Sequence, residues 1–340
     1  MKKLIVWAVL SLLLQISSLY ILNNFVFINS VEFTSKKIEI KKDNTKDINA
    51  TIPSDAIAID LSYGGKYLTY SKEKKLYIED TKTGKESEVK IGNNEIIMSY
   101  KWLEGRNLLA IVEKVKKGGE EKVQLITYNA ANDSKTFVKE ICKFQKNMEV
   151  EKISTSVLTN VYYINVNKGS SRNIVYRIDR NEDIKPVDIK AGVLGNMEVI
   201  PHEDRLIYED KVTGKFFVTS PNKQLKFNSN KKLTFLGIDR NDLIYMGEIN
   251  GGKISSVTYG KVSEDTPTWK KVMFDLPITK ADVYFSNKSE ILINDNLKGI
   301  VKNFTTGNEV EYEGKFIQMK EDFIATSDGS GKLIYKNLKK

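Results

Sequence analysis

The sequence predicts an all-β fold, a seven-bladed β-propeller preceded by one N-terminal transmembrane helix, with six to eight blades compatible with the pattern. Three observations carry this prediction. Residues 4–28 hold no charged side chain. From residue 56 onward, short runs of Val, Ile, Leu, Tyr and Phe alternate with turn residues, and one order of strands occurs in seven successive units. With 41% hydrophobic residues among 340, the chain falls outside the collagen-like and mostly disordered classes.

The N-terminal segment is typical of a membrane anchor. A helix needs about 20 mainly apolar residues to span a bilayer, and residues 4–28 supply them. Lys2 and Lys3 precede this run, as in a short cytoplasmic tail over residues 1–3. We therefore expect a signal-anchor helix over 4–28 in a single-pass protein of the cell membrane, with the C-terminal domain extracytoplasmic in a bacterial envelope.

A cleaved signal peptide is the alternative interpretation of this segment. Such peptides also begin with basic residues and an apolar run, but they need small residues at the cleavage site. The nearest stretch, residues 15–18, has Ile16 where the first small residue should be. Four lysines between residues 36 and 42 weaken the charge argument for the orientation of the anchor.

The first repeat unit is the clearest. It contains four strand-like runs, which are Ile57–Leu61, Tyr67–Tyr70, Leu76–Glu79 and Ser87–Ile91. Turn residues separate them, and Gly64 and Gly65 offer the positive φ angles that a tight hairpin needs.

The same order of strands recurs along the rest of the chain. The candidates for the second strand of each unit are Tyr67–Tyr70, Leu108–Val112, Val161–Ile164, Leu206–Tyr208, Leu243–Tyr245, Ile291–Ile293 and Phe323–Ala325. They begin between 32 and 53 residues apart, a third strand follows each of them, and a fourth strand follows six. This spacing is typical of the four-stranded blades of a β-propeller.

The last unit ends after its third strand, which would leave an exposed sheet edge. Ile38, Glu39 and Ile40 alternate as a strand does and precede the first unit. We therefore predict that residues 36–41, within a linker over 29–55, pair as the outer strand of the last blade. The propeller domain itself is expected over residues 56–340.

One motif links the repeat to a known family. The run from Ser62 to Ser71, SYGGKYLTYS, resembles the S-P-D-G-K-x-I-A-Y-S repeat of TolB-like (WD40-like) propellers, with Tyr63 and Gly64 in place of proline and aspartate. Residues 99–109 resemble a second, degenerate copy. The resemblance implies a propeller fold and a protein-binding or scaffolding role in the cell envelope, and it carries no catalytic residue.

Few groups are available for catalysis. The single cysteine, Cys142, excludes an internal disulfide, a Cys-based zinc site and an iron–sulfur cluster. A serine hydrolase triad would have to use the single histidine, His202, which lies in a polar turn with no nucleophile elbow in the sequence. We predict no catalytic, metal-binding or cofactor-binding residue and no cofactor, and the ligand-binding residues stay unknown.

Four near-matches to functional motifs are interpreted as turns. Residues 179–183 and 294–299 approach a calcium loop, but each lacks a required glycine or ligand oxygen. Residues 328–332 lack the flanking residues of a phosphate loop, and residues 263–269 lack the glycine of a sialidase-type box.

The net charge of +9 is carried mostly by lysine, which supplies 47 of the 53 basic residues. Lysine acts as a hydrated point charge, whereas recognition of bases favours the fork of arginine. We therefore expect no nucleic acid as a partner, but an envelope protein or an anionic envelope polymer. The tryptophans Trp102 and Trp269 are interpreted as packing residues between sheets.

These observations favour a membrane-anchored propeller that acts as a non-catalytic binding or scaffolding module, and not as an enzyme. The alternative is a propeller hydrolase that acts on envelope glycans or peptides, with acidic residues converging on the central channel. A third hypothesis is a sensor subunit that works with another membrane protein.

Overall fold

The computed structural model describes residues 2–21, 48–92, 95–169, 173–320 and 322–338. They belong to two units, Met1–Lys42 and Asp43–Lys340, which we describe separately. The first unit contains helix α1 (Lys2–Ile21), and residues 22–28 of the expected membrane segment lie outside the described residues. In the described part of the chain, no helix combines the length and apolarity that crossing a membrane requires.

Within its described residues, the second unit forms seven antiparallel sheets of consecutive strands, which we number as blades 1 to 7. Blade 1 contains β1 (Ile57–Leu61), β2 (Tyr67–Lys72), β3 (Lys75–Asp80) and β4 (Lys85–Glu88). Blade 2 contains β5 (Ile96–Trp102), β6 (Leu108–Lys117), β7 (Glu120–Asn129) and β8 (Ser134–Lys143). Blade 3 contains β9 (Glu149–Ser156), β10 (Val161–Asn167), β11 (Asn173–Ile178) and β12 (Ile184–Pro186).

The remaining blades continue this order. Blade 4 contains β13 (Leu194–Val199), β14 (Leu206–Asp210), β15 (Lys215–Val218) and β16 (Lys223–Leu225). Blade 5 contains β17 (Leu233–Ile238), β18 (Ile244–Asn250), β19 (Lys253–Gly260), the 3-10 turn η2 (Thr266–Thr268) and β20 (Lys270–Ile278). Blade 6 contains η3 (Lys280–Asp282), β21 (Val283–Phe285), β22 (Ile291–Asp295), β23 (Ile300–Asn303) and β24 (Glu309–Glu311), and blade 7 contains β25 (Lys315–Met319), β26 (Phe323–Ser327) and β27 (Leu333–Asn337).

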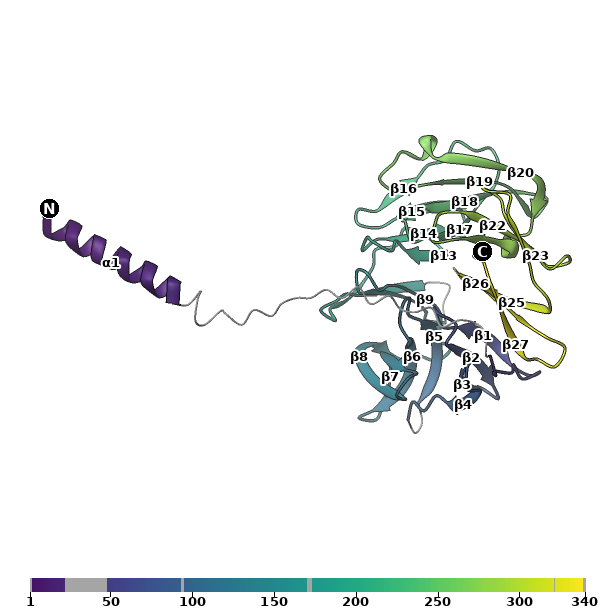
Figure 1. The fold of residues 1–340 in the computed structure, drawn as a ribbon, viewed down its shortest axis with the longest axis horizontal. Helices are drawn as coiled ribbons and strands as arrows, with labels where there is room; N and C mark the ends of the chain where they lie inside the picture. The colour runs from purple at the N-terminus through teal and green to yellow at the C-terminus, as the bar shows by residue number, and fades with distance from the viewer. Residues whose placement is uncertain (1, 22–47, 93–94, 170–172, 321, 339–340) are drawn as a thin grey trace. The chain divides into compact units, whose positions relative to one another are not determined.

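Contacts between first strands join the blades into a ring, as Figure 1 shows. Strands β5 and β9, β9 and β13, β13 and β17, β17 and β21, and β25 and β1 contact each other. The Tyr100 hydroxyl on β5 donates a hydrogen bond to Ala58 O on β1 at 2.6 Å, and the rings of Tyr284 on β21 and Phe316 on β25 lie 5.9 Å apart. Each blade therefore touches the next through its innermost strand, and the predicted seven-bladed propeller is confirmed.

Chain from before the first blade pairs with the last one. Thr51 forms an antiparallel bridge with Lys332. The amide of Ile52 donates to Gly331 O, and the amide of Leu333 donates to Ala50 O, each at 2.9 Å. Residues 50–52 thus lie at the open edge of β27, which the sequence predicts to be covered by N-terminal chain. The predicted closing strand, residues 36–41, lies outside the described residues.

The core lies between neighbouring blades. Trp102 is 4% exposed, its ring stacks on Tyr67 of blade 1 at 6.1 Å, and its Nε1 donates to Thr69 Oγ1 at 3.2 Å. Trp269 is buried and meets Phe227 edge to face at 5.3 Å between the centroids. The interpretation of both tryptophans as packing residues is confirmed.

The first strands carry a shared irregularity. In the described ladders of blades 1, 2, 3, 4, 5 and 7, the first strand holds one more residue than the stretch of second strand that it pairs with. Such a bulge increases the twist of a strand and interrupts its alternation of side chains. The innermost strands therefore bend around the ring axis, where they shape the channel.

Candidate functional site

The turns that join first to second strands lie at one end of the blades, because neighbouring strands are antiparallel. We call this end the front face and the opposite end the back face.

A cavity of about 240 Å³ lies between blades 1, 2, 6 and 7 and is lined by Tyr63 and Lys320, among others. A second cavity of about 90 Å³ is lined by residues of blades 2 to 6, including Arg240. Lys101 and Glu104 line both cavities, which therefore adjoin at the ring axis.

Arg240 crosses the mouth of the channel at the front face. It follows β17 of blade 5, yet its guanidinium carbon lies 4.4 Å from the ring centroid of Tyr63 in blade 1. Its Nη2 lies 4.0 Å from Glu104 Oε2 in blade 2. Blade 5 lies opposite blades 1 and 2 in a ring of seven. The three side chains therefore form a bridge over the channel, which we call the Arg240 bridge.

Sequence reasoning did not find this bridge. Its members come from three turns far apart in the chain, and no local pattern connects them. The one feature of the sequence that pointed to it was Tyr63, which occupies the position of proline in the TolB-like repeat.

Three lysines lie close enough behind this bridge for their charges to interact. Lys101 lies on β5, Lys152 lies on β9, and Lys280 lies in η3. The Nζ of Lys280 donates a hydrogen bond to Phe235 O at 2.7 Å. Burial lowers the pKa of Lys152; Glu198 offsets part of this effect, and the charges of Lys101 and Lys280 add to it. Among the described residues, none of these three lysines has a carboxylate within 4.0 Å. Asp60, Glu104, Glu198 and Asp239 line the adjoining cavities, so the channel holds charges of both signs.

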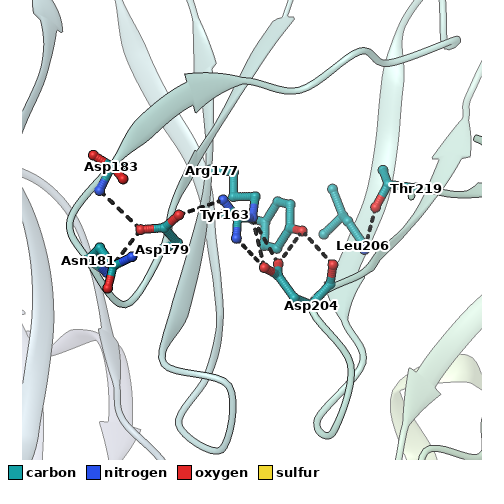
Figure 2. A network of polar contacts seen from close by, with 8 residues as sticks. All are labelled: Tyr163, Arg177, Asp179, Asn181, Asp183, Asp204, Leu206 and Thr219. Atoms are coloured by element: carbon teal, nitrogen blue, oxygen red, sulfur yellow. Dashed lines mark hydrogen bonds and ion pairs between the residues drawn. The ribbon is translucent and has the colours of Figure 1, made fainter. Parts of the chain in front are cut away.

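A polar network between blades 3 and 4 serves packing (Figure 2). Arg177 Nε donates to both carboxylate oxygens of Asp204 at 3.0 Å, and the Tyr163 hydroxyl donates to Asp204 Oδ1 at 2.8 Å. Burial opposes ionisation of Asp204, but hydrogen bonds from Arg177 and Tyr163 outweigh it and lower its pKa. Burial and the bond to Asp204 raise the pKa of Tyr163. The side chains satisfy one another, so the network joins two sheets.

The near-matches found in the sequence are turns in the structure. Asp179 accepts backbone N–H groups of its own loop (Figure 2), as do Asp295 and Asp328. Residues 263–269 run through η2 into β20. His202 lies in an exposed turn, with Nδ1 at 3.0 Å from Asp242 Oδ1. In the part of the chain that the structure describes, no group of three or more His, Cys, Asp or Glu side chains could hold a metal ion.

The comparisons with known proteins support the fold alone. No family model and no curated protein matches the chain. Among solved structures, an oligogalacturonate lyase in complex with manganese aligns over 86% of this chain and 94% of its own, with a TM-score of 0.57 and 9% identity.

Two further matches are not described as enzymes. A chain of a mitotic checkpoint complex aligns over 86% of this chain and 92% of its own, with a TM-score of 0.52 and 13% identity. The propeller domain of Swd1 from Myceliophteria thermophila aligns over 85% and 98%, with a TM-score of 0.51 and 10% identity. These likenesses agree with the ring of blades, and the chain has the fold of a seven-bladed β-propeller.

Proposed function

We propose that this protein is a non-catalytic binding module that holds a protein partner on its front face. The observation that carries the proposal is the Arg240 bridge at the centre of that face. Arginine and tyrosine are enriched among the residues that dominate binding energy, and such residues cluster at the centres of interfaces. Leu158, which lines the same mouth, is 66% exposed and adds apolar surface.

The contacts of Arg240 with Glu104 and Tyr63 are each weak enough for a partner to compete with them. The side chains of Arg240 and Glu104 are 39% and 50% exposed, and their closest atoms are 4.0 Å apart. An ion pair in water contributes about 0–1 kcal/mol, and an exposed cation–π contact about 0.5–1 kcal/mol. An acidic or aromatic group of a partner can therefore replace Glu104 or Tyr63 at little cost.

The alternative function, a hydrolase, would require a different arrangement of side chains at the mouth of the channel. It needs two carboxylates that face each other across a substrate. Three of the four carboxylates that line the two described cavities neighbour a cation instead: Asp60 lies 3.1 Å from Lys320 Nζ, Glu104 faces Arg240, and Glu198 acts on Lys152. The fourth, Asp239, accepts the Tyr245 hydroxyl at 2.8 Å. This arrangement favours binding over glycoside chemistry.

The location of the protein stays a prediction. An anchor at the cell membrane and an envelope partner rest on residues 4–28 and on the resemblance of residues 62–71 to TolB-like repeats. A sensor role beside another membrane protein would use the same front face.

The experiment compares Arg240→Ala with Arg180→Ala. Arg180 is an exposed arginine in the turn between β11 and β12, at the outer rim of the same face. The full chain is used to purify partners from solubilised membranes, and the affinity of each identified protein is then measured with both variants. We expect Arg240→Ala to weaken binding at least tenfold and Arg180→Ala to leave it within twofold. Equal affinity for both variants would contradict the proposal.

A further inference from the structure

A groove on the back face is separate from the Arg240 bridge. It lies between blades 4 and 5, has a volume of about 950 Å³, and is bounded by the turn after β14, the end of β16 and the linker into β17. This volume lies at the upper end of the range for ligand pockets, roughly 300–1,000 Å³, so a single small anion would leave most of it empty.

The charge of the groove is one-sided. Glu209 is the single acidic residue among the described residues that line it. The lining also contains five exposed lysines, which are Lys211, Lys215, Lys226, Lys231 and Lys232. Glu209 is engaged by the Asn196 amide side chain at 3.1 Å. Among the described residues, none of the five lysines forms an ion pair.

Some exposed lysines elsewhere on the propeller form ion pairs. Lys75 lies 2.9 Å from Glu88, Lys143 lies 2.7 Å from Glu120, and Lys271 lies 2.7 Å from Glu248. The groove therefore concentrates positive charge that the protein itself does not neutralise.

Part of this lysine set is held in place by the fold. Ser229 Oγ accepts the amide of Lys231 at 3.1 Å and donates to Glu248 Oε1 on β18 at 2.9 Å. This turn fixes the backbone of the linker against blade 5. Lys231 and Lys232 are therefore presented from a fixed main chain, which reduces the entropy that binding would cost.

The groove offers positive charge but few groups that could recognise nucleic-acid bases or peptide side chains. It contains no arginine, and its aromatic residues are Phe216 and Phe227. Phe216 is 2% exposed, and Phe227 meets the rings of Phe216 and Trp269 edge to face. Single-stranded nucleic acids need exposed rings on which bases stack. The neighbouring edge strand β16 has three residues, which is short for an added peptide strand.

We propose that the groove binds a flexible linear polymer of repeating phosphate groups that carries no bases. Lysine ammonium groups suit such a ligand because they neutralise phosphate as point charges without demanding a fixed geometry. The polymer would lie along the groove and release the counterions it carries. Binding should therefore be strongest at low salt.

The test uses inorganic polyphosphate of uniform length, labelled for fluorescence anisotropy, with the full chain at several salt concentrations. The groove variant replaces four lysines by glutamine, namely Lys211, Lys215, Lys231 and Lys232. The matched control replaces four other exposed lysines by glutamine, namely Lys85, Lys90, Lys116 and Lys253. Circular dichroism and thermal melting establish that each variant is folded.

We expect the groove variant to lose at least tenfold in affinity and the control to stay within twofold. The slope of log K against log salt should shrink by about 3 in the groove variant, since each lost contact removes about 0.7. Equal losses in the two variants would overturn the proposal, because net charge alone would then explain binding. Tighter, groove-dependent binding of polyglutamate or of a single-stranded oligonucleotide of equal charge would also overturn it.

Discussion

Arg177 and Asp204 illustrate how single side chains join the blades. Asp204 lies in the turn of blade 4 before β14 and receives hydrogen bonds from Arg177 and Tyr163 of blade 3 (Figure 2). Because these bonds lower the pKa of Asp204, the folded state favours its ionised form. The resulting stability is present above the ordinary pKa of 3.8 and is lost as the pH falls through the lower folded value.

We expect Asp204→Asn to destabilise the protein at pH 7 by about 1–3 kcal/mol, because it weakens charge-assisted hydrogen bonds to a largely buried arginine. The variant should also lose less stability than the native chain between pH 5 and pH 3. Urea unfolding at the two pH values measures both effects. The control is Asp183→Asn, an exposed residue of the adjoining turn that contributes only its backbone (Figure 2). Equal effects of the two substitutions would contradict this assignment.

At this scale the sequence was informative only for local contacts. The turn roles of Asp179, Asp295 and Asp328 follow from neighbours within four residues, so spacing alone predicts them. The Arg240 bridge joins three blades, and the five groove lysines gather from two. Contacts of this kind depend on the closed ring and leave no trace in a single sequence.

Among the secondary-structure elements, the second strand of every blade was predicted from the sequence, because these strands are buried, apolar and regular. The fourth strands were less well placed: the predicted run 87–91 corresponds to β4 (Lys85–Glu88), which begins two residues earlier. Outer strands are partly exposed, so their apolar residues do not mark their ends.

Apart from β1, the first strands of the blades were not predicted from the sequence. Their bulges break the alternation on which a strand is recognised, and strands such as β9 (Glu149–Ser156) carry polar residues, of which Thr155 and Ser156 line the smaller cavity. The polar residues that make these strands hard to recognise in the sequence therefore also line the channel.

The turn between β1 and β2 provides a test of element geometry. Gly65 has a φ of +71°, and a Cβ there would lie 2.7 Å from Phe323 Cζ in blade 7. Gly64 has no positive φ and nothing within 4 Å of the same position. We expect Gly65→Ala to cost about 1–3 kcal/mol and Gly64→Ala to change stability by less than about 0.5 kcal/mol. Thermal melting that finds both variants equally stable would contradict this geometry.

The whole molecule depends on closure of the ring. The sequence predicts that chain preceding blade 1 completes blade 7, and residues 50–52 do pair beside β27. A run of three paired residues before Pro53 is too short to show a strand period. The longer alternation at 36–41 was therefore the more visible candidate, although it lies outside the described residues.

Of the two proposed binding surfaces, the Arg240 bridge requires this closed ring. The Arg240 bridge needs blades 1, 2 and 5 around one axis, and the groove needs blades 4 and 5 at a fixed spacing. A ring opened between blades 7 and 1 would separate Tyr63 from Arg240 and would expose the edge of β27 to aggregation.

The most direct measurement is a disulfide between Thr51→Cys and Lys332→Cys in the full chain, with Cys142→Ser to remove the native thiol. Bridged antiparallel residues have Cα separations of about 4.5–5.5 Å, within the range that a disulfide accepts. The account predicts nearly complete bond formation under mild oxidation of the folded protein. It predicts none for Thr51→Cys with Lys253→Cys on blade 5. Thiols that stay reduced in the first pair, or equal bond formation in both pairs, would contradict the closed seven-bladed ring.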